Sequence, residues 1–162
     1  MIVSTTGLGQ GAFGSVLKGT YQGRDVAIKM FFKRPWEEVK KSDKLHDIVK
    51  EFKLMKKTRH RNIVRVFGFI IHSEHIGLVM EFANDGNLKQ LIPDPNFRAN
   101  RRLQYEVLLE IAEAINYIHM KGIIHRDIKP DNILIFMQPN GLILPKVTDL
   151  GEGRVRLIIL SH

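Results

Sequence analysis

The chain has 162 residues, of which 44% are hydrophobic and 26% charged, so it can form one ordinary globular domain with a buried core. It contains no cysteine, which excludes a disulfide framework and a thiolate metal site and favours a reducing, cytoplasmic compartment. No apolar run reaches the roughly 18 residues that a membrane-spanning helix needs. The first residues lack the basic and apolar regions of a signal peptide, so we expect neither a membrane span nor a secretory leader.

The net charge of +8 and the isoelectric point of about 9.8 raise the question of an acidic partner, such as nucleic acid or a membrane surface. The cations are scattered along the chain, and their densest cluster is the run KKTRHR at residues 56–61. That run closes a predicted helix, and basic side chains are favourable at the C-terminal end of a helix without any partner. We therefore expect no nucleic-acid partner.

The first half of the chain predicts strands on either side of one helix. Residues 4–31 contain alternating β-branched residues broken by glycines, with a hairpin turn at residues 21–25. Residues 35–60 change to a helical period, with Ser42 as a candidate cap. Two further strands follow within residues 62–83 around a polar turn. The apolar stripe of the helix consists of Leu45, Ile48, Val49, Phe52 and Met55.

The second half predicts a connector, one amphipathic helix and a pair of strands. The connector covers residues 84–96 and includes a short helical piece. The helix ends near Gly122, and residues 123–153 then read as loop, strand, turn, strand and loop. Strands first and a helix later suggest two unequal parts, hinged near residues 82–87. The apolar face of the helix is predicted to hold Leu108, Ile111, Ala112, Ile115 and Ile118.

Three glycines, Gly9, Gly11 and Gly14, form a G-x-G-x-x-G pattern near the start of the chain. Such a pattern lets backbone N–H groups approach phosphate oxygens without obstruction from side chains, although a flexible turn would show it too. A dinucleotide-binding fold requires a helix directly after the glycines. Residues 15–23 read as a strand instead, which argues against that fold.

Lys29 closes the apolar run VAIK, where a lysine can simply mark an exposed strand end. Glu51 lies at helical spacing from Ile48 and Met55, on the flank of the apolar stripe of the following helix. A carboxylate at that edge could face the sheet and pair with the lysine. A lysine held in this way is a fixed positive charge for phosphate oxygens.

The motifs taken together resemble those of the eukaryotic protein kinases. The chain contains GxGxxGxV at residues 9–16, VAIK at residues 26–29 and HRDxKPxN at residues 125–132. The triplet DLG at residues 149–151 stands where the family usually has DFG. RHRNIV at residues 59–64 matches the segment that normally follows the αC helix of a kinase. The motifs occur in the family's order and at about its spacing.

The resemblance implies an α+β fold of the protein-kinase type. Residues 1–83 would form the N-lobe, an antiparallel five-stranded sheet with one αC helix. Residues 84–151 would form part of the mainly helical C-lobe, with the catalytic loop and the metal-binding DLG motif. Residues 152–162 do not resemble a kinase activation segment and are predicted to be a separate tail.

The resemblance also implies a site for ATP. Lys29 would bind the α- and β-phosphates while Glu51 holds it, and the glycine-rich segment would fold over the phosphates. Val16, Ala27 and Leu134 would enclose the adenine, with Met80 behind it. The backbone of residues 81–83 would pair with the adenine edge. The implied ATP-binding residues are Leu8, Gly9, Gly11, Gly14, Val16, Ala27, Lys29, Met80, Glu81, Ala83 and Leu134.

The catalytic groups implied by the resemblance are Asp127, which orients the acceptor hydroxyl, and Lys129, which reaches the γ-phosphate. Lys29 and Glu51 complete the catalytic set, and Asn132 and Asp149 would hold Mg²⁺. The chemistry of these residues agrees, because phosphoryl transfer needs cations at the phosphates and hard oxygen ligands for the metal. Asp127 should stay ionised, since Lys129 is one of the cations beside it.

The chain departs from the family pattern in three places. Leu150 replaces the usual aromatic residue of DFG, and the link between Asn132 and Asp149 is longer than usual. A turn with the sequence QPNG marks that link as a hairpin, and hairpin tips tolerate insertion. The sequence stops soon after the DLG motif, so we expect a truncated kinase domain with part of its second helix uncovered.

The function predicted from the resemblance is transfer of the ATP γ-phosphate to serine or threonine of a protein substrate. Lys129 and Pro130 match the serine/threonine form of the loop, whereas LVMEFANDGNL resembles the tyrosine-kinase-like group. The alternative is a non-catalytic kinase-like module that binds ATP or a protein partner. Retention of all the catalytic residues argues for the enzyme, and the early end of the sequence argues for the module.

Overall fold

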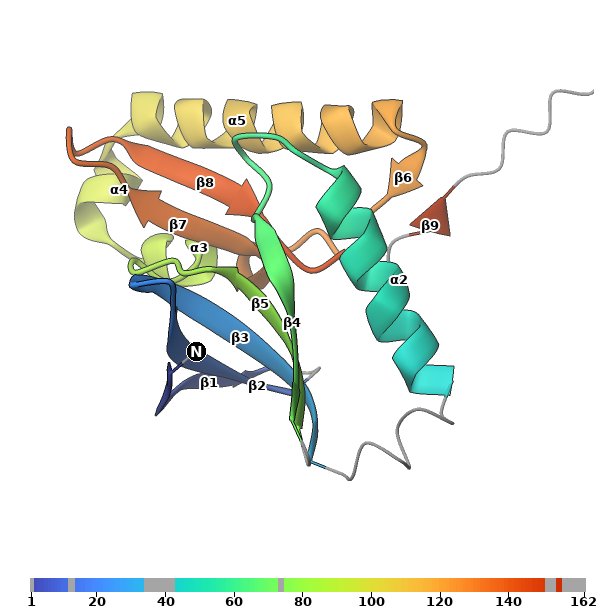
Figure 1. Ribbon diagram of the computed structural model, residues 1–162. Coiled ribbons are helices and arrows are strands. Elements are labelled where there is room, and N and C mark those ends of the chain that lie inside the picture. Colours follow the sequence, from blue (N-terminus) through green and yellow to red (C-terminus); the bar gives the residue numbers. More distant parts are fainter. Residues whose placement is uncertain (1, 12–13, 34–42, 73–74, 151–153, 156–162) are drawn as a thin grey trace, which may run out of the picture. The chain divides into compact units, whose positions relative to one another are not determined.

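The computed structural model describes residues 2–11, 14–33, 43–72, 75–150 and 154–155 (Figure 1). The chain divides into two compact units. Unit 1 consists of Met1–Lys57 and Arg65–Phe82, and unit 2 of Thr58–Val64 and Ala83–His162. Among the described residues no helix is long and apolar enough to cross a membrane.

The described residues of unit 1 form an antiparallel five-stranded sheet and helix α2, as predicted. The strand order is β1-β2-β3-β5-β4, and α2 follows β3 in the chain. The fold prediction for this part of the chain is therefore confirmed. The bounds are β1 Ile2–Gly11, β2 Gly14–Tyr21, β3 Arg24–Lys33, α2 Asp43–Lys57, β4 Val66–His72 and β5 His75–Glu81.

The hairpin between β2 and β3 has the turn chemistry that its sequence predicts. Tyr21 pairs with Arg24, so the loop contains only Gln22 and Gly23. Both have positive φ angles, 52° for Gln22 and 74° for Gly23. Two consecutive residues with positive φ form the turn whose twist matches that of the flanking strands. This short loop fixes the register of β2 against β3.

One face of this sheet is tightly packed around Ile28, which is fully buried. Glycines on both neighbouring strands make room for it. A Cβ atom on Gly19 would lie 2.8 Å from the Ile28 side chain, and one on Gly77 would lie equally close to it. The buried cluster on this face consists of Val26, Ile28, Met30 and Val79, with Leu17 and Ile70 packed against it.

Helix α2 packs on the sheet through aromatic and aliphatic side chains. The ring centroids of Phe52 and Phe69, on β4, lie 4.2 Å apart, and Leu54 and Met55 are buried. Phe52 and Met55 belong to the predicted apolar stripe. The candidate cap Ser42 lies outside the described residues. The exposed side of the helix is basic and contains Lys50, Lys53, Lys56 and Lys57.

Unit 2 combines helices with short strands (Figure 1). Asn87, Asp94 and Asn100 cap its three α-helices, because each side chain accepts a hydrogen bond from a backbone N–H of the first turn. The bounds are α3 Leu88–Leu91, α4 Pro95–Ala99, α5 Arg101–Met120, β6 Ile123–Ile124, the 3₁₀ turn η1 Pro130–Asn132, β7 Ile133–Met137, β8 Ile143–Val147 and β9 Arg154–Val155.

The buried stripe of α5 differs from the predicted one. Of the predicted residues, Ile111 and Ile118 are buried, but Leu108 is 61% exposed and Ala112 is exposed. The helix contains two overlapping apolar stripes, and helical periodicity alone does not decide which of them packs. The buried stripe consists of Val107, Ile111, Ala114 and Ile118.

Residues Thr58–Val64 belong to unit 2, although the sequence analysis placed them in the first part of the chain. The Asn62 amide is fully buried and donates to the Glu110 carboxylate of α5, at 2.6 Å, and to the Pro145 carbonyl, at 2.9 Å. The Val147 N–H donates to the Asn62 carbonyl at 2.8 Å. These bonds fasten the segment to both α5 and β8, which is the physical reason for its place.

A second pairing in unit 2 involves the last described residues. Arg154 and Val155 form β9 and pair with Ile124 and Ile123 of β6, the strand directly before the HRD motif. This pairing connects the start of the segment predicted as a tail to unit 2.

We predict that Gly77→Ala lowers the free energy of unfolding by about 1–3 kcal/mol, the cost of overpacking a core. The new methyl group would lie 2.8 Å from Ile28 Cγ2, 2.9 Å from Met30 Sδ and 3.3 Å from the Lys29 carbonyl oxygen. Urea denaturation of the 162-residue chain, followed by circular dichroism, measures the change. Gly68→Ala is the control, because a Cβ there would have no neighbour within 4 Å among the described atoms. Equal denaturation midpoints for the two variants would contradict the packing analysis.

Candidate active site

The register of the sheet in unit 1 brings four predicted ATP-binding residues to one face. Val16 pairs with Lys29 across β2 and β3, and Ala27 pairs with Met80 across β3 and β5. Residues directly opposite each other in neighbouring strands face the same side, and so do residues two apart in one strand. Val16, Ala27, Lys29 and Met80 therefore share the face opposite the Ile28 cluster.

Lys29 lies in the middle of this face and is only 9% exposed. Its Nζ atom lies 5.2 Å from the centre of the Phe31 ring, two residues along β3. Glu51 lies in α2, but its side chain is outside the described part of the structure, so its pairing with Lys29 stays a prediction.

The predicted phosphate-binding glycines form the hairpin between β1 and β2. Gly11 pairs with Gly14 and Gly9 with Val16, so Leu8, Gly9 and Gly11 lie at the end of β1. Gly14 begins β2. The glycines are thus followed by a strand and not by the helix that a dinucleotide-binding fold needs.

The residues predicted to pair with the adenine edge lie where unit 1 ends and unit 2 begins. The Glu81 N–H donates to the Arg65 carbonyl at 2.9 Å, and its carboxylate accepts from the Arg65 N–H at 2.6 Å. These bonds hold the end of β5 against the residue before β4. Ala83, half-buried, is the first residue of the second segment of unit 2, directly after Phe82.

In unit 2, the catalytic loop, residues 125–132, is closed by a ring of four hydrogen bonds. The Asp127 N–H donates to His125 Nδ1 at 3.3 Å, and His125 Nε2 lies 2.8 Å from the Thr148 carbonyl oxygen. The Thr148 N–H donates to the Asn132 carbonyl at 3.0 Å. The Asn132 amide donates to the Asp127 carbonyl at 2.9 Å. The ring connects the loop to the residue directly before Asp149.

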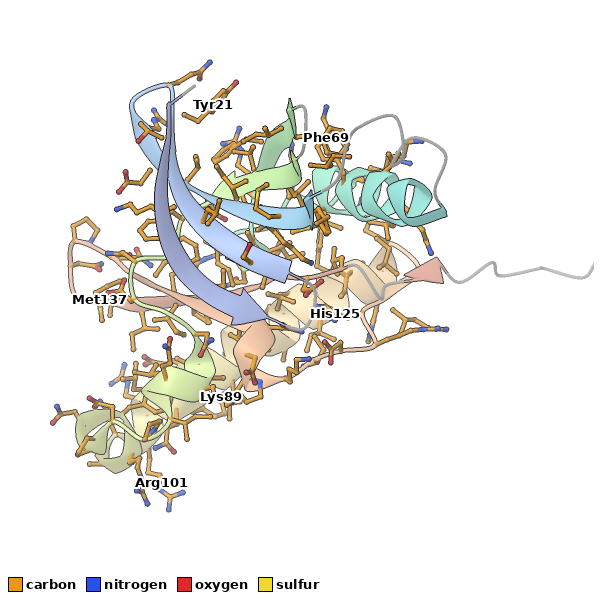
Figure 2. The ribbon with its side chains drawn as sticks, turned by 90° about the horizontal axis from the view of Figure 1, so that it is seen from below. Tyr21, Phe69, Lys89, Arg101, His125 and Met137 are labelled. Carbon is orange, nitrogen blue, oxygen red and sulfur yellow. The ribbon has the colours of Figure 1, made fainter. Side chains whose placement is uncertain are left out.

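The ring also fixes the tautomer of His125, which is buried and marked in Figure 2. Nδ1 accepts a hydrogen bond from a backbone N–H, so it carries no proton. Nε2 faces a carbonyl oxygen, so it must donate. The histidine is therefore a neutral bridge between the catalytic loop and Thr148.

Asp127 is oriented by two donors that approach the same carboxylate oxygen. Lys129 Nζ lies 2.6 Å from Oδ2, and Asn132 Nδ2 lies 2.9 Å from it. Among the described residues Oδ1 is then left to accept from another group. The hydrogen bond from Lys129 holds the pKa of the Asp127 carboxyl below its usual value, partial burial opposes this, and Asn132 lowers the pKa further. The Asp127 carboxylate is thus ionised and, among the described residues, keeps Oδ1 as an acceptor.

Asn132 and Asp149 present oxygen atoms suited to a hard cation. Asn132 is buried and uses its Nδ2 atom for both bonds to Asp127, which leaves Oδ1 as the atom that could hold a metal. Asp149 follows Thr148 of the ring and has a φ angle of 64°, and Arg126 in the loop has one of 75°. Non-glycine residues with positive φ are uncommon and concentrate at functional sites.

No group of three or more His, Cys, Asp and Glu side chains within the described ranges could hold a metal by itself. Mg²⁺ is usually held by one or two protein oxygens together with the phosphates of its nucleotide. Asn132 and Asp149 fit that pattern.

The comparisons with known proteins decide the family. The sequence model of the family described as “Protein kinase domain” matches residues 2–156, almost the whole chain. The chain belongs to the protein kinase family. The match runs past the boundary predicted at residue 151 and includes β9.

Three relatives are serine/threonine kinases by name. They are the probable serine/threonine-protein kinase gdt2 of Dictyostelium discoideum (33% identity), the probable serine/threonine-protein kinase SIS8 of Arabidopsis thaliana (32%) and the serine/threonine-protein kinase RAD53 of Saccharomyces cerevisiae (35%). The alignments cover 91–92% of this chain but only 9–17% of the relatives. The chain spans less than a fifth of the length of these relatives.

Two other kinase motif residues lie in unit 2. Leu134 is in β7 and forms a bridge with Asn87, and the Ile135 N–H donates to the Gly86 carbonyl at 2.9 Å. Leu150 is 1% exposed, so the leucine that replaces the usual aromatic residue is a core side chain.

Sequence reasoning missed two contributors to this kinase site. His125 was not among the predicted site residues, whereas it bridges two backbone groups of the ring. Thr148 contributes through its backbone alone, so no side-chain pattern could have identified it. The only signal available for it was its place directly before Asp149.

We predict that Lys129→Met raises the pKa of the Asp127 carboxyl, because it removes the largest cause of the lowering. Asn132→Ala should raise this pKa by a smaller amount. A carboxyl-carbon NMR titration measures both changes. Because the folded pKa is below the unfolded one, Asp127 stabilises the fold above its unfolded pKa, and the stabilisation is lost as the pH falls through the folded value.

Lys89→Met is the matched control, because Lys89 hydrogen-bonds to Asp131 and lowers the pKa of that carboxyl instead. It should raise the pKa of Asp131 and leave that of Asp127 unchanged. If Asp127 titrates identically in wild type and Lys129→Met, the assigned cause is wrong.

Proposed function

We propose that this chain carries the ATP-binding and phosphoryl-transfer residues of a serine/threonine protein kinase. Members of the family generally use ATP and Mg²⁺. The observation that carries the proposal is the orientation of Asp127, held through Oδ2 by Lys129 and Asn132 with Oδ1 left to accept. Such a carboxylate can accept the proton of a hydroxyl group during its attack.

The residues on the Lys29 face of the sheet in unit 1 suit the binding of ATP, the phosphate donor. Lys29 supplies a buried positive charge on the sheet face that holds Val16, Ala27 and Met80. Phosphoryl transfer depends mostly on positioning and on neutralising charge, so a fixed ammonium matters more there than a mobile one. Small and apolar side chains beside it suit a flat, apolar base.

Bound Mg²⁺ would supply positive charge that offsets the negative charge developing on the phosphates during transfer. Asn132 Oδ1 and the Asp149 carboxylate would hold it. In this arrangement the ring of hydrogen bonds gives both ligands a defined place, since Asn132 is a member and Asp149 follows Thr148, another member. Asp127 remains separate, as the group that holds the acceptor hydroxyl.

The proposed acceptor is serine or threonine of a protein. Lys129 lies 2.6 Å from Asp127 and is available beside the acceptor hydroxyl, where the serine/threonine form of the loop places its lysine. The names of the relatives agree with this substrate class. A non-catalytic module that only binds ATP is the competing outcome of the test below.

We predict that the chain transfers phosphate from Mg-ATP to a mixture of dephosphorylated proteins, and that acid hydrolysis yields phosphoserine and phosphothreonine. Asp127→Asn should lower the rate by about 10²–10⁴-fold, the usual contribution of a general base. Lys29→Met should also lower it strongly, because the buried phosphate-binding charge is lost. Radiolabelled ATP makes both rates measurable.

Lys121→Met and Glu113→Gln are the matched controls for Lys29→Met and Asp127→Asn, since Glu113 lies in α5, Lys121 follows its last residue, and both side chains are exposed. They should transfer phosphate at the wild-type rate. Full activity of Asp127→Asn would refute the proposed role. A melting temperature that rises with Mg-ATP, fails to rise in Lys29→Ala and Asp149→Asn, and comes with no transfer would identify the non-catalytic module.

A further inference from the structure

One carboxylate beside the catalytic loop has no part in the proposed phosphoryl transfer. Asp131 lies in η1, four residues after Asp127, and its side chain is 42% exposed. Lys89 of α3, marked in Figure 2, places Nζ 2.9 Å from Asp131 Oδ1 and is itself 67% exposed. The pair is thus on the surface, next to the residue proposed to hold the acceptor hydroxyl.

The backbone fixes Lys89 beside this turn. The Ile135 N–H donates to the Gly86 carbonyl, and Asn87 bridges Leu134, so the residues before α3 line the edge of β7. A capping box between Asn87 and Gln90 then starts the helix. Lys89 lies in this single turn of helix, so the backbone positions it beside Asp131.

The charge balance of this surface depends on Lys89. Lys89 Nζ donates a hydrogen bond to Asp131 Oδ1 at 2.9 Å, so the carboxylate is paired with an ammonium. Lys129 already pairs with Asp127 at 2.6 Å. Lys89 of α3 is therefore the ammonium that hydrogen-bonds the carboxylate of Asp131 in the described structure, and without it an exposed negative charge would remain.

We propose that Lys89 is a specificity-determining residue that masks Asp131 from the acceptor peptide, so that neutral or acidic residues beside the acceptor serine or threonine are preferred over arginine or lysine. The inference rests on the proposed function, because only an acceptor bound at Asp127 has to pass this pair. A basic flanking residue would compete with Lys89 for Asp131, whereas an acidic one can use the remaining N–H donors of Lys89.

The test uses three peptides that share one serine acceptor and differ only in flanking residues, which are alanine, aspartate or arginine. In Lys89→Met, kcat/KM for the arginine peptide relative to the aspartate peptide should rise about threefold to fivefold, the size of an exposed charge pair. Asp131→Asn should move the ratio in the opposite direction. The double variant should return to within about twofold of wild type, and 0.5 M salt should shrink every change.

Lys121→Met is the matched control, because it removes an exposed lysine of the same unit at the far end of α5 and should leave the ratio unchanged. Fluorescence anisotropy of the labelled peptides with Mg-ADP measures the same preference without turnover. An unchanged ratio in Lys89→Met, an equal change in Lys121→Met, or no binding of any peptide overturns the inference. If the wild type transfers phosphate to none of the peptides, the proposed function fails, and the anisotropy ratio decides this inference by itself.

Discussion

The side-chain amide of Asn132 is the constraint on which the catalytic loop depends. It is buried and donates to both the backbone carbonyl and the carboxylate of Asp127. A buried amide cannot leave these bonds without a penalty of about 1–3 kcal/mol for each unsatisfied group. These two bonds hold the Asp127 carboxylate through Oδ2 and leave Oδ1 as its acceptor among the described residues. Positive φ angles at Arg126 and Asp149 are tolerated because the surrounding bonds over-determine them.

In unit 1 a different constraint, the alternation of side chains along a strand, decides which face of the sheet each residue occupies. Ile28 is wedged between Gly19 and Gly77 on one face, so β3 cannot slide against its neighbours without losing that packing. A slip by one residue would turn every side chain of β3 to the other face. The packing of Ile28 therefore also fixes the positions of its neighbours Ala27 and Lys29 on the opposite face. The packing of the Ile28 cluster thus sets the geometry of the face that holds Lys29.

The sequence predicted the elements better than it predicted their packing. The five strands and the main helices follow from periodicity and turn residues, and the family follows from motifs whose spacing is fixed by chemistry. Periodicity could not decide which stripe of α5 is buried, because Leu108 and Val107 are equally apolar and only the partner surface selects between them. Nor could it show that Thr58–Val64 belong to unit 2, since the bonds of Asn62 join residues 48 and 83 positions away.

In the candidate site, too, the sequence identified the residues but not the hydrogen bonds between them. Asp127, Lys129 and Asn132 are recognisable because each is a charged or amide group at a diagnostic spacing in one loop. Their bonds to one another were not recognisable, since which oxygen of Asp127 receives the donors depends on backbone angles. Backbone contributors such as Thr148 leave no trace in the sequence, because every residue type except proline has the same N–H and C=O groups.

Three lysines of this chain differ in burial, and the same ammonium group therefore suits a different role in each place. Lys29 is 9% exposed, the Lys129 side chain 41% and the Lys89 side chain 67%. Screening by salt and by water weakens an exposed charge far more than a buried one. A buried ammonium is therefore suited to a constant task such as holding phosphates. Half-exposed Lys129 can orient Asp127 and still move, and exposed Lys89 can only bias a choice between substrates. The net charge of +8 does not reveal these differences in exposure, because they depend on where each lysine lies in the fold.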